Sequence, residues 1–167
     1  IAHSCNSYFA SAYRKTIDKY PTPQEGIERW RQHLRSFGLG DYLGYDLPAG
    51  NKGLIPDADF YNRYYQYPKY RWYTPATISN AIGQGEVLLT PIQMAHFTSI
   101  IANRGHFYTP HIIKKIGLKD SIPEEYTTLQ NTTISPKNFD PIIEGMADVY
   151  RYGTASKPFI GIPGIEI

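Results

Sequence analysis

The chain of 167 residues has little cysteine, little net charge and no long apolar run. Its single cysteine, Cys5, excludes an internal disulfide and leaves the redox compartment open. Lysine and arginine number 17 against 15 acidic residues, and a net charge of +2 gives no strong attraction to nucleic acid or to an anionic membrane. No apolar stretch approaches the roughly 20 residues that a membrane-spanning helix needs.

Signatures of metals and cofactors are also missing. The five histidines include no pair at the i, i+4 spacing of a helical zinc site. The pairs Gly38-Leu39-Gly40 and Gly83-Gln84-Gly85 complete neither phosphate-binding glycine pattern. We interpret both as turns, because glycine adopts positive φ at low cost. We therefore expect no metal and no cofactor.

The composition is that of a globular domain, with 41% hydrophobic and 19% charged residues. The chain does not begin with Met and has no signal peptide, and it closes on the apolar run Ile160–Ile167. Natural termini are usually polar. We therefore expect residues 1–167 to be part of one larger domain.

Helical periodicity dominates the pattern of apolar residues. The first predicted helix starts at Ser7, and Phe9, Tyr13 and Ile17 follow at fourfold spacing. Capping boxes at Thr22 and Thr90, each followed by proline, predict two more helix starts. The helix after Thr90 is apolar all round, which predicts a buried helix.

The last predicted helix is capped by Ser135 and ends at Gly153. Strands are few and late, with His111–Ile116 and the terminal run as the predicted examples. Residues 38–58 indicate an ordered loop, and residues 118–133 a polar surface excursion. The expected fold class is α+β, mostly helical, with most strands lying elsewhere.

An aromatic cluster occupies residues 61–73, which hold six tyrosines and one tryptophan. Arg63, Lys69 and Arg71 lie between these rings, an arrangement that also occurs where proteins stack on single-stranded nucleic acid. The cluster is short, and acidic residues elsewhere offset its charge. We therefore favour packing of the rings on their own domain, and expect no nucleic-acid partner.

Ser4-Cys5-Asn6 places a hydroxyl and a carboxamide immediately before the first helix. Such a pair suits a proton relay and an amide clamp on a peptide, yet the commoner role of serine or asparagine at this position is a helix cap. A thiol nucleophile at Cys5 is a further alternative, since helix N-termini lower thiol pKa values. His3 is too close in sequence to serve as its base, so we discount a Cys-His pair.

The order of short motifs along the chain resembles the transpeptidase domain of class B penicillin-binding proteins, and most closely the elongation branch known as penicillin-binding protein 2. The resemblance covers essentially the whole chain. It rests on the following segments, in this order: Ser4-Cys5-Asn6-Ser7-Tyr8-Phe9, Phe37-Gly38-Leu39-Gly40, Gly44-Tyr45-Asp46-Leu47-Pro48, Lys52-Gly53-Leu54-Ile55-Pro56, Ile82-Gly83-Gln84-Gly85-Glu86, Thr90-Pro91-Ile92-Gln93-Met94-Ala95, Ile101-Ala102-Asn103-Arg104-Gly105, Gly145-Met146, Gly153-Thr154-Ala155 and Ile162-Pro163-Gly164-Ile165.

The resemblance implies a serine D,D-transpeptidase of the penicillin-binding protein and β-lactamase-like fold, which uses S-x-x-K, S-x-N and K-T-G motifs. Only S-x-N occurs in these residues, so S-x-x-K is expected before Ile1 and K-T-G after Ile167. By the same resemblance Ser4 is the catalytic proton relay and Asn6 binds the substrate peptide, while Cys5 fills the variable place. The glycine pair at 83–85 and the Thr90 helix are expected to be architectural.

The implied partners are the peptidoglycan stem peptide, β-lactams, a membrane glycan polymerase and proteins of the elongation complex. The implied location is the periplasmic side of a membrane anchor that is not in this chain. Two alternatives stay open at this point. The first is a non-catalytic scaffold or sensor of the same fold, and the second is an aromatic-basic nucleic-acid binder.

Overall fold

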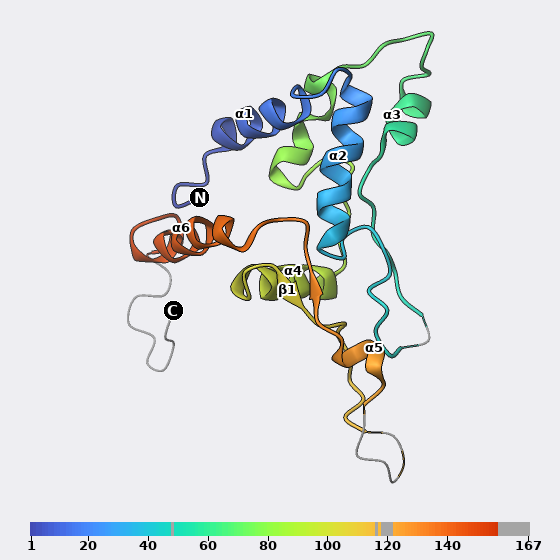
Figure 1. Ribbon diagram of the computed structural model, residues 1–167. Helices are drawn as coiled ribbons and strands as arrows, with labels where there is room; N and C mark the ends of the chain where they lie inside the picture. The colour runs from blue at the N-terminus through green and yellow to red at the C-terminus, as the bar shows by residue number, and fades with distance from the viewer. Residues whose placement is uncertain (48, 116, 118–121, 157–167) are drawn as a thin grey trace.

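The computed structural model describes residues 1–47, 49–115, 117 and 122–156. Its helices are α1 (Asn6–Ile17), α2 (Pro23–Ser36), α3 (Ala58–Tyr64), α4 (Pro91–Ala102), α5 (Glu124–Thr127) and α6 (Asp140–Arg151), with 3-10 helices η1 (Thr74–Ile82) and η2 (Pro136–Asn138). The antiparallel strands are β1 (His106–Phe107) and β2 (Gln130–Asn131). In Figure 1, α2 runs between α1 and α3, α4 lies below its C-terminal end, and α6 lies to the left of that end.

Threonine caps start two of these helices, as the sequence predicts, but of the two predicted capping boxes only the one at Thr90 is complete. The Thr22 hydroxyl accepts a hydrogen bond from the backbone N–H of Glu25 at 3.2 Å. At the start of α4 the capping box is complete, because Thr90 accepts from Gln93 N–H at 3.3 Å and Gln93 Oε1 accepts from Thr90 N–H at 2.9 Å. Both helices therefore begin with backbone donors that are satisfied locally.

Gln93 also holds the loop of residues 38–58 in place. Its side chain is 1% exposed, and its Nε2 donates to the carbonyl oxygens of Asp41 and Lys52 at 3.0 Å each. The Gly38 carbonyl lies 3.4 Å from the same nitrogen. One amide thus satisfies backbone carbonyls from two parts of a loop that has no ladder of its own, which explains how this glycine-rich stretch stays ordered.

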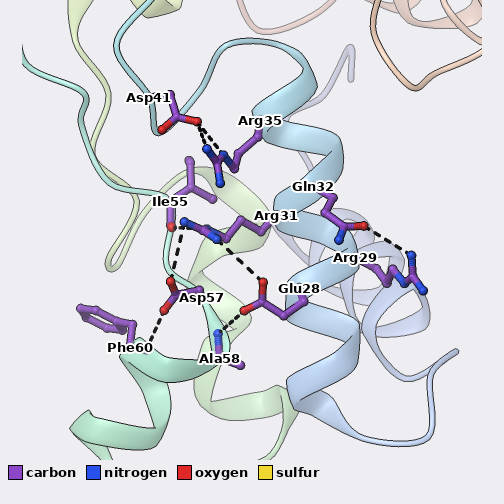
Figure 2. Close-up of polar contacts among 10 residues, drawn as sticks. All are labelled: Glu28, Arg29, Arg31, Gln32, Arg35, Asp41, Ile55, Asp57, Ala58 and Phe60. Carbon is purple, nitrogen blue, oxygen red and sulfur yellow. Dashed lines mark hydrogen bonds and ion pairs between the residues drawn. The ribbon is translucent and has the colours of Figure 1, made fainter.

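The polar side of α2 fixes the end of the same loop (Figure 2). Arg31 Nε donates to the Ile55 carbonyl at 3.3 Å, and its guanidinium lies between Glu28 and Asp57 at 3.8 and 3.7 Å. Glu28 in turn accepts from the backbone N–H of Ala58 at 2.8 Å. These charge-assisted bonds attach the start of α3 to the middle of α2.

Two clusters of buried side chains form the interior. The tyrosine core lies among α1, α2 and α3 and consists of Tyr13, Ile17, Ile27, Tyr61 and Trp72. The phenylalanine core lies near α4 and consists of Phe37, Leu39, Ile55, Ile100, Ile101 and Phe139. Trp30 on α2 packs against both, so α2 joins the two cores.

The prediction that α4 is buried on all sides is wrong for the part of the chain that the structure describes. Ile100 is fully buried and Gln93 nearly so, but Met94 is 58% exposed and Ile92 is 37% exposed. The described residues cover one face of the helix. Hydropathy alone reports that a helix is apolar and does not report which face has a neighbour.

The predicted strand His111–Ile116 is also wrong over the described residues 111–115, which are irregular. The backbone N–H of Ile112 donates to the Asp46 carboxylate at 2.8 and 3.0 Å, and the N–H of Ile113 donates to the same group. A side chain therefore takes the donors that a sheet ladder would use. Residue 116 and the predicted strand Ile160–Ile167 lie outside the described residues.

The last helix begins later than predicted. Ser135 makes no side-chain cap, and Pro136 opens the short turn η2 before α6 starts at Asp140. The reason is Pro141, because proline is tolerated in the first turn of a helix and not in its interior. The predicted polar excursion contains α5 and β2, whose residues Gln130 and Asn131 are exposed as expected.

Candidate functional site

Ser4-Cys5-Asn6 forms the start of α1. Asn6 is the first residue of the helix, Cys5 is its N-cap with extended backbone, and Ser4 has a left-handed φ of 48°. No side chain caps this helix end. The helix-cap role that the sequence left open for Ser4 and Asn6 is therefore absent.

The side chains of this triplet face outward. Ser4, Cys5 and Asn6 are all exposed, and no side chain or backbone group of the described residues hydrogen bonds their side chains. The first N–H groups of α1 are also free of side-chain partners, and its first turn contains no acidic residue. A hydroxyl, a carboxamide and the positive end of a helix are thus presented together.

Residues ahead of Ser4 pack on α6 and on the residues just after it, so the start of α1 lies beside the end of α6 (Figure 1). A Cβ on Gly145 would come within 3.0 Å of the Ile1 side chain, which shows how closely the two segments approach. The Ala2 carbonyl accepts from Thr154 N–H at 3.1 Å, and Ser4 N–H donates to the Ile1 carbonyl at 2.9 Å. The chain therefore leaves α6 next to the Ser-x-Asn triplet.

The other end of α1 is anchored in the interior. Tyr13 is 6% exposed, and its ring meets Trp30 edge to face at 5.5 Å. Its hydroxyl lies 2.9 Å from Thr77 Oγ1 and 3.3 Å from Asn80 Nδ2, both on η1. Burial raises the pKa of the Tyr13 phenol, so the group stays protonated and able to donate.

A second tyrosine continues this polar chain. Asn80 Nδ2 donates to the Tyr61 hydroxyl at 2.8 Å, and Tyr61 donates to Glu86 Oε2 at 3.1 Å. Burial raises the pKa of Tyr61 strongly.

Gly83, with a φ of 67°, ends η1 and turns the chain toward Glu86, so the predicted turn at 83–85 is confirmed. The sequence indicated the glycine pair but gave no signal for the tyrosine bonds.

The aromatic cluster is divided between interior and surface. Tyr61 is fully buried and Trp72 is 2% exposed, with its indole N–H donating to Asn62 at 2.9 Å. The predicted packing of the cluster on its own domain is confirmed for these two rings. The exposed tyrosines of the cluster are Tyr64, Tyr67, Tyr70 and Tyr73.

A hollow of about 500 Å³ follows the flank of α1, away from the Ser-x-Asn triplet. Its walls are mainly apolar and come from α1, α2, α4 and the segment 81–89, with Phe9, Trp30 and Phe97 among the largest side chains. Neither Ser4 nor Asn6 lines it. The hollow is therefore distinct from the exposed triplet.

Among the residues that the structure describes, no three His, Cys, Asp or Glu side chains gather as metal ligands would. None of the described helices combines the length and the apolar character of a bilayer span.

Comparison with known proteins gives the chain its relatives. The sequence model of the penicillin binding protein transpeptidase domain matches residues 1–167. The peptidoglycan D,D-transpeptidase MrdA of Acinetobacter baumannii is 33% identical over 162 residues, which are 92% of this chain and 21% of that protein. The chain thus spans about a fifth of the length of this curated relative.

Solved structures agree with the sequence relatives. Penicillin-binding protein 2 of Pseudomonas aeruginosa, in complex with WCK 5153, aligns with a TM-score of 0.71 at 29% identity, over 91% of this chain and 31% of that one. The complex of penicillin-binding protein 2 and MreC from Helicobacter pylori aligns with a TM-score of 0.72 at 26% identity, over 98% of this chain and 27% of that one. These likenesses confirm the predicted transpeptidase fold.

Proposed function

Because this chain belongs to the family of penicillin-binding protein transpeptidase domains, we propose that it is the Ser-x-Asn part of a peptidoglycan D,D-transpeptidase that acts in cell-wall elongation. One observation carries the proposal beyond the family match. The residues that match the family motif, Ser4 and Asn6, stand exposed and without partners at an uncapped helix start. Groups that serve only as caps would be bonded to that helix.

The proposed chemistry is acyl transfer on the D-Ala-D-Ala end of a stem peptide. A serine of an S-x-x-K motif attacks the penultimate carbonyl, and the bond to the terminal D-Ala breaks as its amine takes a proton. A hydroxyl both donates and accepts, so Ser4 passes this proton between the serine–lysine pair and the leaving amine. The carboxamide of Asn6 donates to and accepts from the peptide backbone and orients the lysine.

The proposal places the rest of the constellation outside these 167 residues. Neither S-x-x-K nor K-T-G occurs in them. Residues 1–167 would lie between the two motifs in one domain, with S-x-x-K ahead of Ile1 and K-T-G after Ile167. The start of α1 lies beside the end of α6, which supports this arrangement, because the chain that leads toward K-T-G departs next to Ser4. By itself the 167-residue chain would be inactive.

The proposed partners follow from the relatives. A solved relative is a complex with MreC, and we propose a similar elongation-complex partner for the full-length protein, together with a membrane glycan polymerase. Its ligands would be stem peptides and β-lactams, and its location the periplasmic side of the cytoplasmic membrane. No cofactor and no metal enter the proposed reaction.

The test is the acylation of the full-length protein by a fluorescent penicillin. Ser4→Ala is expected to slow acylation by about 10²–10⁴-fold, the usual range for general acid–base help. Ser7→Ala is the matched control, since Ser7 is an exposed serine on the same helix. An unchanged rate in Ser4→Ala would refute the relay.

Two other outcomes would redirect the proposal. Stable labelling of the 167-residue chain alone would mean that the nucleophile lies within it. A full-length protein that is never labelled would support the alternative of a non-catalytic scaffold or sensor of this fold.

A further inference from the structure

Each hydroxyl around Tyr13 has one proton to donate, and this limit decides which partner is the donor in each hydrogen bond. Thr77 donates its one hydroxyl proton to the Thr74 carbonyl at 3.0 Å, so Tyr13 must be the donor in the 2.9 Å bond between their oxygens. Tyr61 donates its one hydroxyl proton to Glu86. Both phenols are therefore left as acceptors for the amide of Asn80.

The orientation of the Asn80 side chain follows from this count. If the amide were flipped, its oxygen would face two hydroxyls whose protons are already committed, and both contacts would be repulsive. Its Nδ2 therefore donates to both tyrosines, and Oδ1 is buried without a hydrogen-bond partner among the described residues. A buried acceptor left unpaired costs free energy, which the two donated bonds offset. In this arrangement all of these hydrogen bonds form together.

This cluster determines where α1 lies. Tyr13 follows Asn6 by seven residues, close to two full helical turns, so the two residues lie on nearly the same side of α1 and about 10 Å apart along it. Asp18, just after the helix, accepts a hydrogen bond from the Thr74 hydroxyl on the same 3-10 helix. Hydrogen bonds from Tyr13 and Asp18 to η1 thus oppose both a rotation of α1 about its axis and a shift along it.

We infer that Tyr13 is a positioning residue of the proposed acyl transfer: its hydroxyl, bound to Thr77 and Asn80, fixes the rotation and height of α1 and thereby places Ser4 and Asn6. The inference rests on the proposed function. Asn6 is the first residue of α1 and Ser4 stands just ahead of its N-cap, and neither side chain has a partner in the described chain, so the position of α1 contributes to the placement of both. Misplacement of a reacting group by about 1 Å is enough to cost up to 10²-fold in rate.

The test uses the full-length protein and the rate of acylation by a fluorescent penicillin. Tyr13→Phe keeps the ring and removes the hydroxyl, and Thr77→Val deletes the same bond from the other side. Each is expected to slow acylation about tenfold. Thr77→Ser keeps the hydroxyl and is the matched control, with a rate expected within about twofold of the wild type.

A mutant cycle separates positioning from stability. In a background with both Ser4→Ala and Asn6→Ala the effect of Tyr13→Phe is expected to shrink to about twofold, because both groups that would be misplaced are already missing. An equal effect in both backgrounds would show a general loss of folded protein and overturn the inference. Wild-type rates in both Tyr13→Phe and Thr77→Val would also overturn it.

Failure to fold is an informative result as well. If Tyr13→Phe and Thr77→Val do not fold while Thr77→Ser does, the hydroxyls serve stability alone and the inference is wrong. The proposed function fails separately, since it requires Ser4→Ala itself to slow acylation. A slow Ser4→Ala protein with unaffected Tyr13→Phe would leave the proposed function standing and remove the positioning role.

Discussion

The two ends of α1 are built in opposite ways. Toward its C-terminus Tyr13 is 6% exposed and Ile17 fully buried, and both belong to the tyrosine core. At its N-terminus Ser4 and Asn6 are exposed and make no side-chain hydrogen bonds to the described residues. Packing therefore holds the helix at one end, while the other end is left available. Stability and the proposed activity should respond to different substitutions along one helix.

The N-termini of α1, α2 and α4 also differ in how they are capped. Threonine side chains cap α2 and α4, whereas α1 has Cys5 at its N-cap and no side-chain cap. A cap satisfies backbone donors and adds stability. At α1 no side chain takes these donors, and Tyr8 N–H donates to the Cys5 carbonyl at 3.1 Å instead.

The largest expected effect concerns the buried end. Ile17→Ala removes a fully buried side chain from the tyrosine core and is expected to lower the free energy of unfolding by about 2–4 kcal/mol. Lys15→Ala, an exposed position on the same helix, is expected to change it by less than about 0.5 kcal/mol. Denaturant unfolding of the full-length variants measures both. Equal losses would remove the contrast between the two sides of α1.

A smaller effect concerns alkaline pH. Burial raises the pKa of Tyr13 and Tyr61 above their ordinary value of 10.0. Near pH 10 the phenols of the unfolded chain ionise, while those of the folded chain stay protonated. The free energy of unfolding therefore falls as the pH rises above this value. Their contribution to stability is fully present below pH 10 and is lost as the pH rises toward the folded pKa values.

Thermal unfolding of the full-length protein across this range is the measurement. Tyr13→Phe is expected to flatten the alkaline loss of melting temperature. Tyr64→Phe is the matched control, because the Tyr64 side chain is 67% exposed. The same slope in the wild type and in Tyr13→Phe would contradict the expectation.

The smallest expected effect sharpens the comparison of helix starts. Thr22→Ala removes the oxygen that accepts from Glu25 N–H and should lower the free energy of unfolding by about 1 kcal/mol. Cys5→Ala stands at the equivalent N-cap of α1 and should cost less than about 0.5 kcal/mol, since no cap bond is lost. A larger loss at Cys5 than at Thr22 would mean that the start of α1 is stabilised in another way.

The sequence predicts local structure well where one residue decides it. Threonine followed by proline marks the starts of α2 and α4, and fourfold spacing marks α1, because these signals act within a single turn. The same spacing places the Ser-x-Asn triplet at the start of α1, where the structure has it.

The bonds that hold α1 could not be predicted from such local signals. Tyr13 and Thr77 are 64 residues apart, and no periodicity relates them. The same limit applies to Asp46, whose carboxylate takes the backbone donors of a segment 66 and 67 residues further on. Hydrogen bonds between residues far apart in the sequence depend on how the chain packs, and the pattern of residues along the sequence does not predict them. The roles of Ser4 and Asn6 stay predictions.

The left-handed backbone of Ser4 has an evolutionary consequence. At a φ of 48° a residue with a Cβ is strained by about 1–2 kcal/mol relative to glycine, so glycine would be the more stable choice at position 4. If the hydroxyl relays a proton, selection for turnover and selection for robustness favour different amino acids at this one site. Under the proposed function, Ser4→Gly would then raise the free energy of unfolding and slow the acyl transfer. Ser4→Ala would lose the hydroxyl and keep the backbone strain.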